Sequence, residues 1–360
     1  MKLKNLNIIN FKNYDSYEFV AGDGINCFVG NNGVGKTNLL DAIYYLSYCK
    51  SFFNSADIQN IKYEEEFFVI EGNYLLGKVP EKLYCGVKKG QKKKFKRNSK
   101  EYERLVDHIG LFVSVMVSPR DSELILGGSD VRRKFLDGII AQFDKKYLEC
   151  LLKYNKVLKQ RNALLKYFQK ERKWNDEDLL AWDSSLVDLG EYIFKMRLEF
   201  VEEFVPIFNE RYGFISGDKE NVNIEYVSQL KDSSYESQLL NYREKDRISA
   251  YSNCGVHKDD LIFTLNKYPV KKFGSQGQQK SFLLALKFGQ FSFLKKSKGY
   301  FPVLLLDDIF DKLDHERISK LMDLVSRNEF GQVFITDTNE SRVRSILESH
   351  SVDFNLITIG

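Results

Sequence analysis

The feature that most constrains this chain is the segment of residues 30–37, which reads Gly-Asn-Asn-Gly-Val-Gly-Lys-Thr. It matches the pattern G-x-x-x-x-G-K-[ST] at every required position. The apolar residues 25–29 before it are typical of a short strand, and apolar residues at positions 39, 40, 43 and 46 have helical spacing. Glycines let backbone N–H groups wrap around an anion, and the start of a helix adds partial positive charge. The sequence therefore predicts a strand, a phosphate-binding loop and a helix that together bind a nucleoside triphosphate.

The residue types in this loop predict a role for its members. We expect Lys36 to reach the terminal phosphates, which makes it a catalytic as well as a binding residue, and we expect the hydroxyl of Thr37 to hold Mg²⁺. The predicted nucleotide-binding residues of the loop are Gly30, Asn31, Asn32, Gly33, Val34, Gly35, Lys36 and Thr37.

A second part of the site follows an apolar run at residues 303–306, where Asp307 and Asp308 occur side by side. A short, fully apolar run after a proline is typical of a buried parallel strand. We expect Asp307 to hold Mg²⁺ beside the loop, and Asp308 to orient or deprotonate an attacking water. Apolar runs followed by two acids are common, so this pattern gains its weight only from further motifs.

The middle of the chain has helical periodicity. Apolar residues step by three and four over residues 140–168 and again over 179–200, with a turn at 174–176 between them. The pattern predicts an antiparallel helical hairpin with arms of about 45 Å, if each runs for ~30 residues. We expect Pro206 and Gly213 to end the second helix, and residues 214–250 are polar and weakly patterned.

The most basic segment of the chain lies between two strand-like stretches, with Gly90 and Gln91 as the predicted tip of a hairpin. Two interpretations are equally supported: a solvated hairpin whose lysines protect an edge strand, or a contact with the phosphate backbone of DNA. The candidate DNA-binding residues are Lys88, Lys89, Lys92, Lys93, Lys94, Lys96 and Arg97.

Composition sets broader limits. A chain of 360 residues exceeds what one hydrophobic core usually holds, so two lobes are expected. The net charge of +4 is too small to indicate a nucleic-acid binder by itself. The five cysteines are scattered without a C-x-x-C pair, which argues against a disulfide framework or a structural zinc site. No apolar run approaches the ~20 residues that a membrane span needs, and we expect a cytoplasmic protein.

A third motif occurs at residues 274–280, Gly-Ser-Gln-Gly-Gln-Gln-Lys, at the start of a predicted helix. It resembles the S-x-G-Q signature of ATP-binding-cassette ATPases. The resemblance implies that Ser275, Gly277 and Gln278 bind ATP held by a second copy, with Ser275 acting in catalysis. Two copies would then close on two nucleotides. The alternative, a helix start unrelated to nucleotide, is disfavoured by the order of the motifs, since Lys312-Leu313-Asp314 follows in the position of the D-loop.

The phosphate loop and the two acids are about 270 residues apart, with the helical hairpin between them. This arrangement is similar to the RecF family of recombination mediator ATPases nearly from end to end. Five segments carry the resemblance: residues 10–14 (NFKNY), 37–43 (TNLLDAI), 132–137 (RRKFLD), 255–261 (GVHKDDL) and 275–280 (SQGQQK).

The resemblance implies an α/β fold, with an ATP-binding-cassette type P-loop ATPase head and an inserted, mostly helical second lobe. The head is expected to contain a mixed sheet, with antiparallel strands beside a parallel core. The expected boundaries are residues 1–118 for the N-terminal part of the head, 119–249 for the helical lobe, and 250–360 for the C-terminal part of the head.

The resemblance also implies a function. It predicts an ATP-dependent DNA-binding protein of replication and recombinational repair, which forms a homodimer with ATP on DNA at single-strand gaps or junctions. RecR is the implied partner, with RecO close by, in loading the recombinase and supporting the SOS response. ATP and Mg²⁺ are the implied cofactors, and slow, DNA-stimulated hydrolysis would reset binding.

Some positions depart from related families, and other hypotheses stay open. Thr336-Asp337-Thr338 stands where cassette transporters carry a switch histidine, and Asp308 stands where most cassettes have Glu. Val256 replaces a usual Pro, and His257 either contacts nucleotide or DNA or is simply packed in its loop. The alternatives are a transporter ATPase subunit, an ATP-dependent DNA clamp without significant turnover, and an ATPase–nuclease fusion. The fusion would need an extra acidic nuclease domain after the ATPase, whereas the sequence ends about twenty residues after Thr338.

Overall fold

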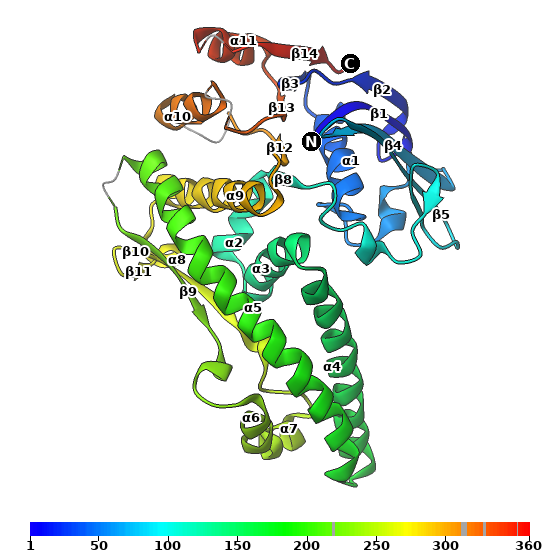
Figure 1. Ribbon diagram of the computed structural model, residues 1–360, viewed down its shortest axis with the longest axis vertical. Helices are drawn as coiled ribbons and strands as arrows, with labels where there is room; N and C mark the ends of the chain where they lie inside the picture. The colour runs from blue at the N-terminus through cyan, green and yellow to red at the C-terminus, as the bar shows by residue number, and fades with distance from the viewer. Residues whose placement is uncertain (218–219, 311–314, 327–328, 351) are drawn as a thin grey trace. The chain divides into compact units, whose positions relative to one another are not determined.

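The computed structural model describes the whole chain except residues 218–219, 311–314, 327–328 and 351 (Figure 1). The predicted D-loop, Lys312-Leu313-Asp314, therefore lies outside the described residues. The chain forms two compact units. The first unit contains Met1–Ser122, Glu210–Lys219 and Ser275–Gly360, and the second contains Glu123–Asn209 and Glu220–Gly274.

The first unit is built on two sheets. An antiparallel six-stranded sheet has the order β2-β1-β4-β5-β6-β7, and a parallel five-stranded sheet has the order β14-β3-β13-β12-β8. The strands are β1 (Lys2–Phe11), β2 (Tyr14–Val20), β3 (Ile25–Val29), β4 (Phe67–Leu76), β5 (Val79–Lys88), β6 (Lys94–Arg97), β7 (Lys100–Glu101), β8 (Ser114–Val117), β12 (Val303–Leu306), β13 (Val333–Asp337) and β14 (Phe354–Thr358). The predicted α/β head, with antiparallel strands and a parallel core, is confirmed.

Burial explains why these segments form their sheets. Strands β3, β8, β12 and β13 are buried at every position, as expected for parallel strands covered on both faces. Strand β1 instead buries Leu3, Leu6 and Ile8 and leaves the residues between them partly exposed. Helix α1 (Lys36–Tyr48) packs its apolar residues into the same hydrophobic cluster as both sheets, including Leu39 and Leu46.

Three further helices lie in the first unit. Helix α9 (Gln276–Lys298) contains the predicted helical segment after the signature, and α10 and α11 lie near the C-terminus of the chain. Their bounds are α10 (His315–Ser326) and α11 (Glu340–Ser349). No helix in the described part of the chain combines the length and apolar character that a bilayer crossing requires.

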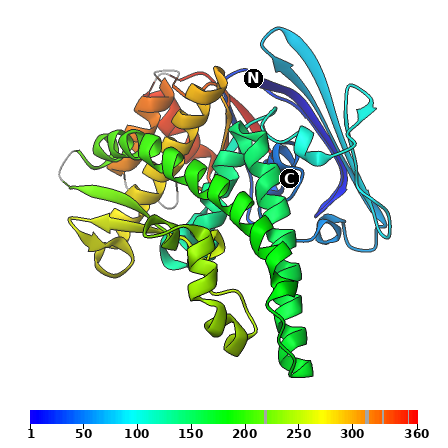
Figure 2. The same ribbon diagram turned by 60° about the horizontal axis from the view of Figure 1, so that its bottom comes forward.

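The second unit contains the predicted helical hairpin. Helices α4 (Lys145–Glu171) and α5 (Glu177–Ser216) run side by side in both views (Figures 1 and 2). The side chain of Asn175 in the connecting turn accepts a hydrogen bond from the Glu177 N–H. The remaining helices of this unit are α2 (Glu123–Leu126), α3 (Ser129–Phe143), α6 (Tyr235–Asn241), α7 (Arg243–Ser249) and α8 (Val270–Phe273).

The prediction that Pro206 and Gly213 end the second helix was wrong, because α5 continues through both of them to Ser216. A proline inside a helix removes one backbone hydrogen bond. Apolar side chains on the turns around it are fully buried, among them Phe204 and Phe208, and this packing outweighs the lost bond.

The boundaries of the two units also differ from the expected ones. Strand β10 (Asp260–Leu265) pairs antiparallel with β9 (Val222–Val227), so residues 250–274 belong with the second unit and not with the head. Strand β11 (Tyr268–Pro269) completes this three-stranded sheet. Strand β9 lies in the segment that we expected to be weakly patterned, although its residues alternate between buried and exposed.

Candidate nucleotide site

The phosphate loop lies between β3 and α1, as predicted, and its geometry explains why three of its positions are glycine. Gly30, Gly33 and Gly35 all have positive φ angles, +155°, +85° and +109°. A Cβ atom on Gly30 would lie 2.3 Å from the carbonyl oxygen of Ile359, and one on Gly35 would lie 2.6 Å from the Asn13 side chain. These glycines therefore allow both the loop conformation and the close approach of neighbouring segments.

Asn13 supports the loop from outside. Its Nδ2 donates to the carbonyl of Val34 (2.9 Å), and its Oδ1 accepts from Nδ2 of Asn38 at the start of α1 (2.7 Å). Its neighbour Lys12 forms a 2.6 Å ion pair with the buried carboxylate of Asp41. From sequence, residues 10–14 were only markers of the family, and the structure gives Asn13 a role in positioning the loop.

Lys36 and Thr37 occupy the first turn of α1. Lys36 is only 5 % exposed, and its Nζ donates at 2.8 Å to the carbonyl oxygens of Gly30 and Asn31, so its charge lies over the loop. The hydroxyl of Thr37 donates at 2.7 Å to Oδ1 of Asp307. Strands β3, β13 and β12 are parallel neighbours, which brings the loop and Asp307 to the same edge of the sheet.

A second hydroxyl reaches the same carboxylate. Thr336, buried at the end of β13, donates at 2.9 Å to Oδ1 of Asp307, and its oxygen accepts from the Asp308 N–H at 3.0 Å. Burial raises the pKa of Asp307, while the hydrogen bonds from Thr37 and Thr336 and the charge of Lys36 lower it. Asp308 has a positive φ of 47°, a left-handed conformation that is uncommon outside glycine. From the sequence, the segment that begins at Thr336 was noted only because cassette transporters carry a histidine there, and the contact with Asp307 was not predicted.

The oxygens of Thr37 and Asp307 fit a magnesium site. Mg²⁺ is octahedral with oxygen ligands at 2.0–2.1 Å, so neighbouring ligands lie about 3 Å apart. The two side-chain oxygens are 2.7 Å apart, close to this separation. The described residues contain no group of three or more His, Cys, Asp or Glu side chains that could hold a metal. Mg²⁺ bound by phosphates commonly uses only one or two protein ligands, so the donor set fits this ion.

Ser275 begins helix α9 as its N-cap. Its Oγ accepts from the Gln278 N–H (3.2 Å), and the Gln278 side chain accepts from the Ser275 N–H (2.7 Å), which forms a capping box. Ser275 is exposed, and a Cβ on Gly277 would come within 3.2 Å of the Arg317 guanidinium. A direct hydrogen bond joins Thr37 to Asp307, whereas the described hydrogen bonds of Ser275 are made within its own helix.

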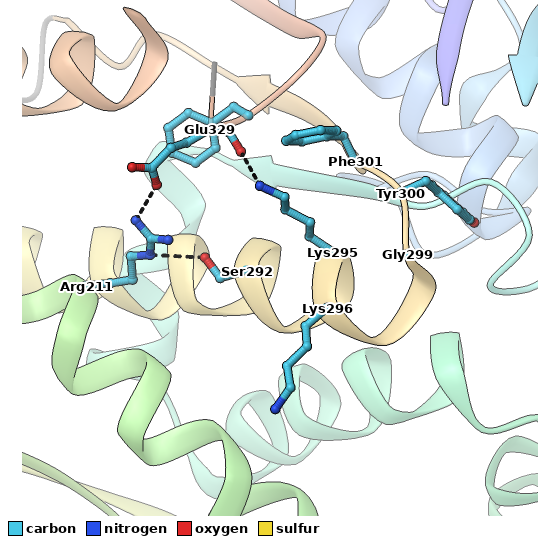
Figure 3. Close-up of a pocket in the computed structure, with 9 residues that line it drawn as sticks. Arg211, Ser292, Lys295, Lys296, Gly299, Tyr300, Phe301 and Glu329 are labelled. Atoms are coloured by element: carbon cyan, nitrogen blue, oxygen red, sulfur yellow. Dashed lines mark hydrogen bonds and ion pairs between the residues drawn. The ribbon is translucent and has the colours of Figure 1, made fainter. Parts of the chain in front are cut away.

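A pocket of about 410 Å³ lies at the other end of α9 (Figure 3). The helix has 23 residues and is therefore about 34 Å long. Arg211 crosses it, donating to Oγ of Ser292 (3.0 Å) and to the Glu329 carboxylate (2.7 Å). The pocket contains none of the predicted site residues.

His257 is a packed histidine, one of the two alternatives left open by the sequence. Its Nε2 lies 3.1 Å from the carbonyl of Ser252, which can only accept, so this nitrogen carries the proton. Its Nδ1 then accepts from the hydroxyl of Tyr154 at 2.9 Å. Burial lowers the pKa of His257 to about 4, which keeps the ring neutral.

Two of the family segments meet in the second unit. Arg132 forms a two-point ion pair with Asp260 at 2.7 and 2.8 Å. The buried Arg197 of α5 pairs with Asp137 (2.9 Å) and Asp259 (2.8 Å). Residues 132–137 and 255–261, far apart in sequence, are therefore joined by buried and half-buried charges.

The predicted basic hairpin exists, with β5 and β6 paired antiparallel, but its cations differ in their surroundings. Lys93 pairs with Asp57 (2.7 Å), Arg97 pairs with the nearly buried Glu81, and Lys89 pairs with Glu66 (3.1 Å). The Nζ of Lys96 lies 5.5 Å from the centre of the Tyr84 ring. The exposed members that form no ion pair with any described residue are Lys88, Lys92 and Lys94.

Comparisons with known proteins agree with this geometry. The RecF/RecN/SMC N terminal domain model matches residues 2–355. The DNA replication and repair protein RecF of Phocaeicola vulgatus is 51% identical over all of this chain and 96% of its own length. That of Flavobacterium johnsoniae is 47% identical over the full length of both.

Solved structures of RecF proteins are also similar to this chain. The recombination mediator protein RecF-ATPrS of the RecFOR pathway is 31% identical, with a TM-score of 0.89 over all of this chain and 96% of that one. A Pyrococcus furiosus Smc head domain is 16% identical with a TM-score of 0.55 and shares the fold.

A phosphate loop beside an acid-ended parallel strand, with a signature-like helix start in the same unit, defines a P-loop ATPase head of the ATP-binding-cassette and SMC class. The full-length matches are more specific than the fold. The chain belongs to the RecF family, and the resemblance inferred from its motifs is confirmed.

Proposed function

We propose that this protein is an ATP-dependent DNA-binding protein of DNA replication and recombinational repair, in which ATP closes a homodimer on DNA. The observation that carries the proposal is the 2.7 Å contact between Thr37 and Asp307, which builds the loop half of a nucleotide site. The exposed helix start at Ser275 supplies the complementary half. A helix N-terminus favours the γ-phosphate of ATP held by another copy.

Hydrolysis at this site would use the chain's own residues as follows. Lys36 neutralises the terminal phosphates, Thr37 and Asp307 hold Mg²⁺, and Asp308 orients the attacking water. When bound, Mg²⁺ neutralises charge that develops on the phosphate oxygens. The Asp308 side chain is one methylene shorter than the Glu of most cassettes, so we expect slow turnover that DNA accelerates.

The DNA and its setting follow from the family. The RecF structures are of a mediator in the RecFOR pathway, which supports RecR as a partner with RecO close by. Single-strand gaps or junctions as the preferred DNA are part of the same proposal. Help in recombinase loading, support of the SOS response and a cytoplasmic location belong to the same proposal. The exposed lysines of the β5–β6 hairpin, Lys88, Lys92 and Lys94, are candidate phosphate contacts.

Complementation between two variants tests the dimer. Lys36→Met removes the loop half-site and Ser275→Arg blocks the signature half-site, so neither variant alone should dimerise with ATP and gapped DNA in size-exclusion chromatography with light scattering. In an equimolar mixture, a mixed dimer has one intact site, which combines the loop of the Ser275→Arg copy with the signature of the Lys36→Met copy. We expect partial recovery of dimer and of ATP turnover in the mixture.

The control for this experiment is Lys78→Met, an exposed lysine outside the site, which should behave as the unchanged protein. A mixture that stays monomeric would contradict the shared site. Single-turnover phosphate release on DNA separates this ATPase from a clamp without turnover, because a clamp of that kind would dimerise but release no phosphate.

A further inference from the structure

Helix α4 has an unusual distribution of charge. Between Glu149 and Glu171 there is no acidic residue, while five exposed lysines occur in this stretch. We call them the lysine face: Lys153, Lys156, Lys159, Lys166 and Lys170. In the neighbouring helix, residues 177–210 contain nine acidic residues and only two basic ones. The positive charge is therefore a property of one helix and not of the whole lobe.

The lysine face lies opposite the packed side of α4. At 100° per residue, four of the lysines project within roughly 80° of one another, and Lys153 lies on the flank. The buried residues Tyr154, Leu158 and Leu165 point the other way. The row from Lys153 to Lys170 is about 26 Å long, since it covers 17 steps of 1.5 Å.

These lysines form no ion pair with any described residue. The one strongly buried cation of the helix, Arg161, is neutralised by Asp183 (2.6 Å) and Asp246 (2.7 Å). Lysines three or four positions apart repel each other by a few tenths of a kcal/mol per pair. A face that only kept the helix soluble would intersperse acids to relieve this repulsion, so the arrangement favours an anionic partner.

We propose that the lysine face of α4 binds the phosphate backbone of duplex DNA, an inference that rests on the DNA-binding function proposed above. Duplex DNA carries one charge per ~1.7 Å of axis with both strands counted, so 26 Å of it carries about 15 phosphates, and those on the side that faces the row can contact the lysines. Lysines are point charges that give affinity without sequence specificity.

A protein partner fits this face less well. Stable protein interfaces are depleted in lysine and have an apolar or aromatic centre. Among the exposed large apolar residues of α4, only Leu152 and Tyr167 are near the lysines, and they are fifteen residues apart. The β5–β6 hairpin, by comparison, has three cations in ion pairs with its own unit.

The test is a fourfold variant, Lys156→Gln, Lys159→Gln, Lys166→Gln and Lys170→Gln, with binding to duplex DNA followed by fluorescence anisotropy in ATP at several salt concentrations. We expect affinity to fall at least tenfold at 150 mM salt. The slope of log K against log salt should become shallower by about 3 to 4, because four phosphate contacts are lost.

The matched control removes the same charge elsewhere through Lys78→Gln, Lys134→Gln, Lys195→Gln and Lys296→Gln, all exposed lysines, and should keep the original slope. Replacing the four α4 lysines with Arg should also retain binding. ATP affinity and thermal stability measured on every variant ensure that a loss reflects the DNA contact and not misfolding.

Other outcomes separate the two proposals. If the unchanged protein does not bind DNA with ATP, the proposed function fails. If it binds and the fourfold variant binds with the same affinity and slope, the lysine face is not a DNA contact and this inference is overturned. Unchanged DNA affinity together with lost binding of poly-glutamate would assign the face to an acidic protein instead.

Discussion

The hydroxyl of Thr37 donates a 2.7 Å hydrogen bond to the carboxylate of Asp307, a residue 270 positions further along the chain. Both oxygens also suit Mg²⁺, so this contact joins the predicted phosphate-binding loop to the acid that we propose as a metal ligand. It is made possible by the order of the parallel sheet, in which the strand before the loop and the strand before Asp307 flank β13.

Replacing Asp307 should abolish metal-dependent chemistry without unfolding the head. Asp307→Asn removes the anionic ligand of Mg²⁺, so we expect ATP hydrolysis to fall by roughly 100-fold or more. Because burial raises the pKa of this carboxyl, a neutral amide should leave the unfolding temperature close to its original value. Phosphate release and differential scanning fluorimetry measure the two effects. Asp130→Asn, at an exposed acid, is the control, and an Asp307→Asn rate within twofold of the original would refute the assignment.

Thr336 should act as a positioning residue for both acids. Thr336→Val keeps the shape of the side chain but removes the donor to Asp307 and the acceptor for the Asp308 N–H. We expect a several-fold higher Mg²⁺ concentration for half-maximal nucleotide binding, and a loss of about 1–2 kcal/mol in the free energy of unfolding. Thr336→Ser retains the hydroxyl and should restore the Mg²⁺ dependence. A Val variant that loses stability but keeps the original Mg²⁺ dependence would mean a purely structural role.

Gly30 should not tolerate a side chain. In Gly30→Ala the new Cβ would lie 2.3 Å from the Ile359 carbonyl, which follows β14, so the loop or that strand must shift. We expect a loss of about 1–3 kcal/mol in stability and a clear drop in ATP affinity. Gly138→Ala in α3 meets no atom within 4 Å and should instead stabilise by ~0.5–1 kcal/mol. Urea unfolding and ATP titration compare the pair, and equal behaviour of the two variants would argue against the steric account.

His257 should make stability depend on pH. Its folded-state pKa of about 4 lies below the ~6.5 of an unfolded chain, so between these values the unfolded state binds more protons. The stabilisation is therefore fully present above pH 6.5 and is lost as the pH falls towards 4, by about 3 kcal/mol. His108, whose pKa burial also lowers to about 4, adds a similar dependence. Urea unfolding from pH 4.5 to 7.5 should show a shallower slope for His257→Gln, and an unchanged slope would contradict the buried neutral ring.

Short-range patterns were sufficient to predict the elements of the candidate nucleotide site. The loop, its flanking strand and helix, the strand before Asp307 and the helix after Ser275 all occur as the sequence predicts. Each depends on neighbours in the chain, such as glycines at positive φ or an N-cap serine, so the local sequence contains the necessary information.

The predictions that were wrong, and the features that were not predicted, have physical causes. Helix α5 passes Pro206 because tertiary packing of buried Phe side chains exceeds the local cost of a proline, which no local rule can weigh. Strand β9 alternates as Val222, Ile224 and Tyr226, a signal that could have been found, but it becomes a strand only by pairing with β10. Lys93 was a candidate DNA contact in the sequence, but in the folded chain it forms an ion pair with Asp57.

The sequence by itself determined that this protein binds a nucleoside triphosphate and belongs to the RecF family, because those motifs are contiguous and their chemistry is local. Only the tertiary structure decided which side chains serve one another across the chain. Thr336 on Asp307, Asn13 under the loop and Arg197 between Asp137 and Asp259 are contacts between distant segments. Their distances depend on strand order and packing, which the separation of residues along a chain does not encode.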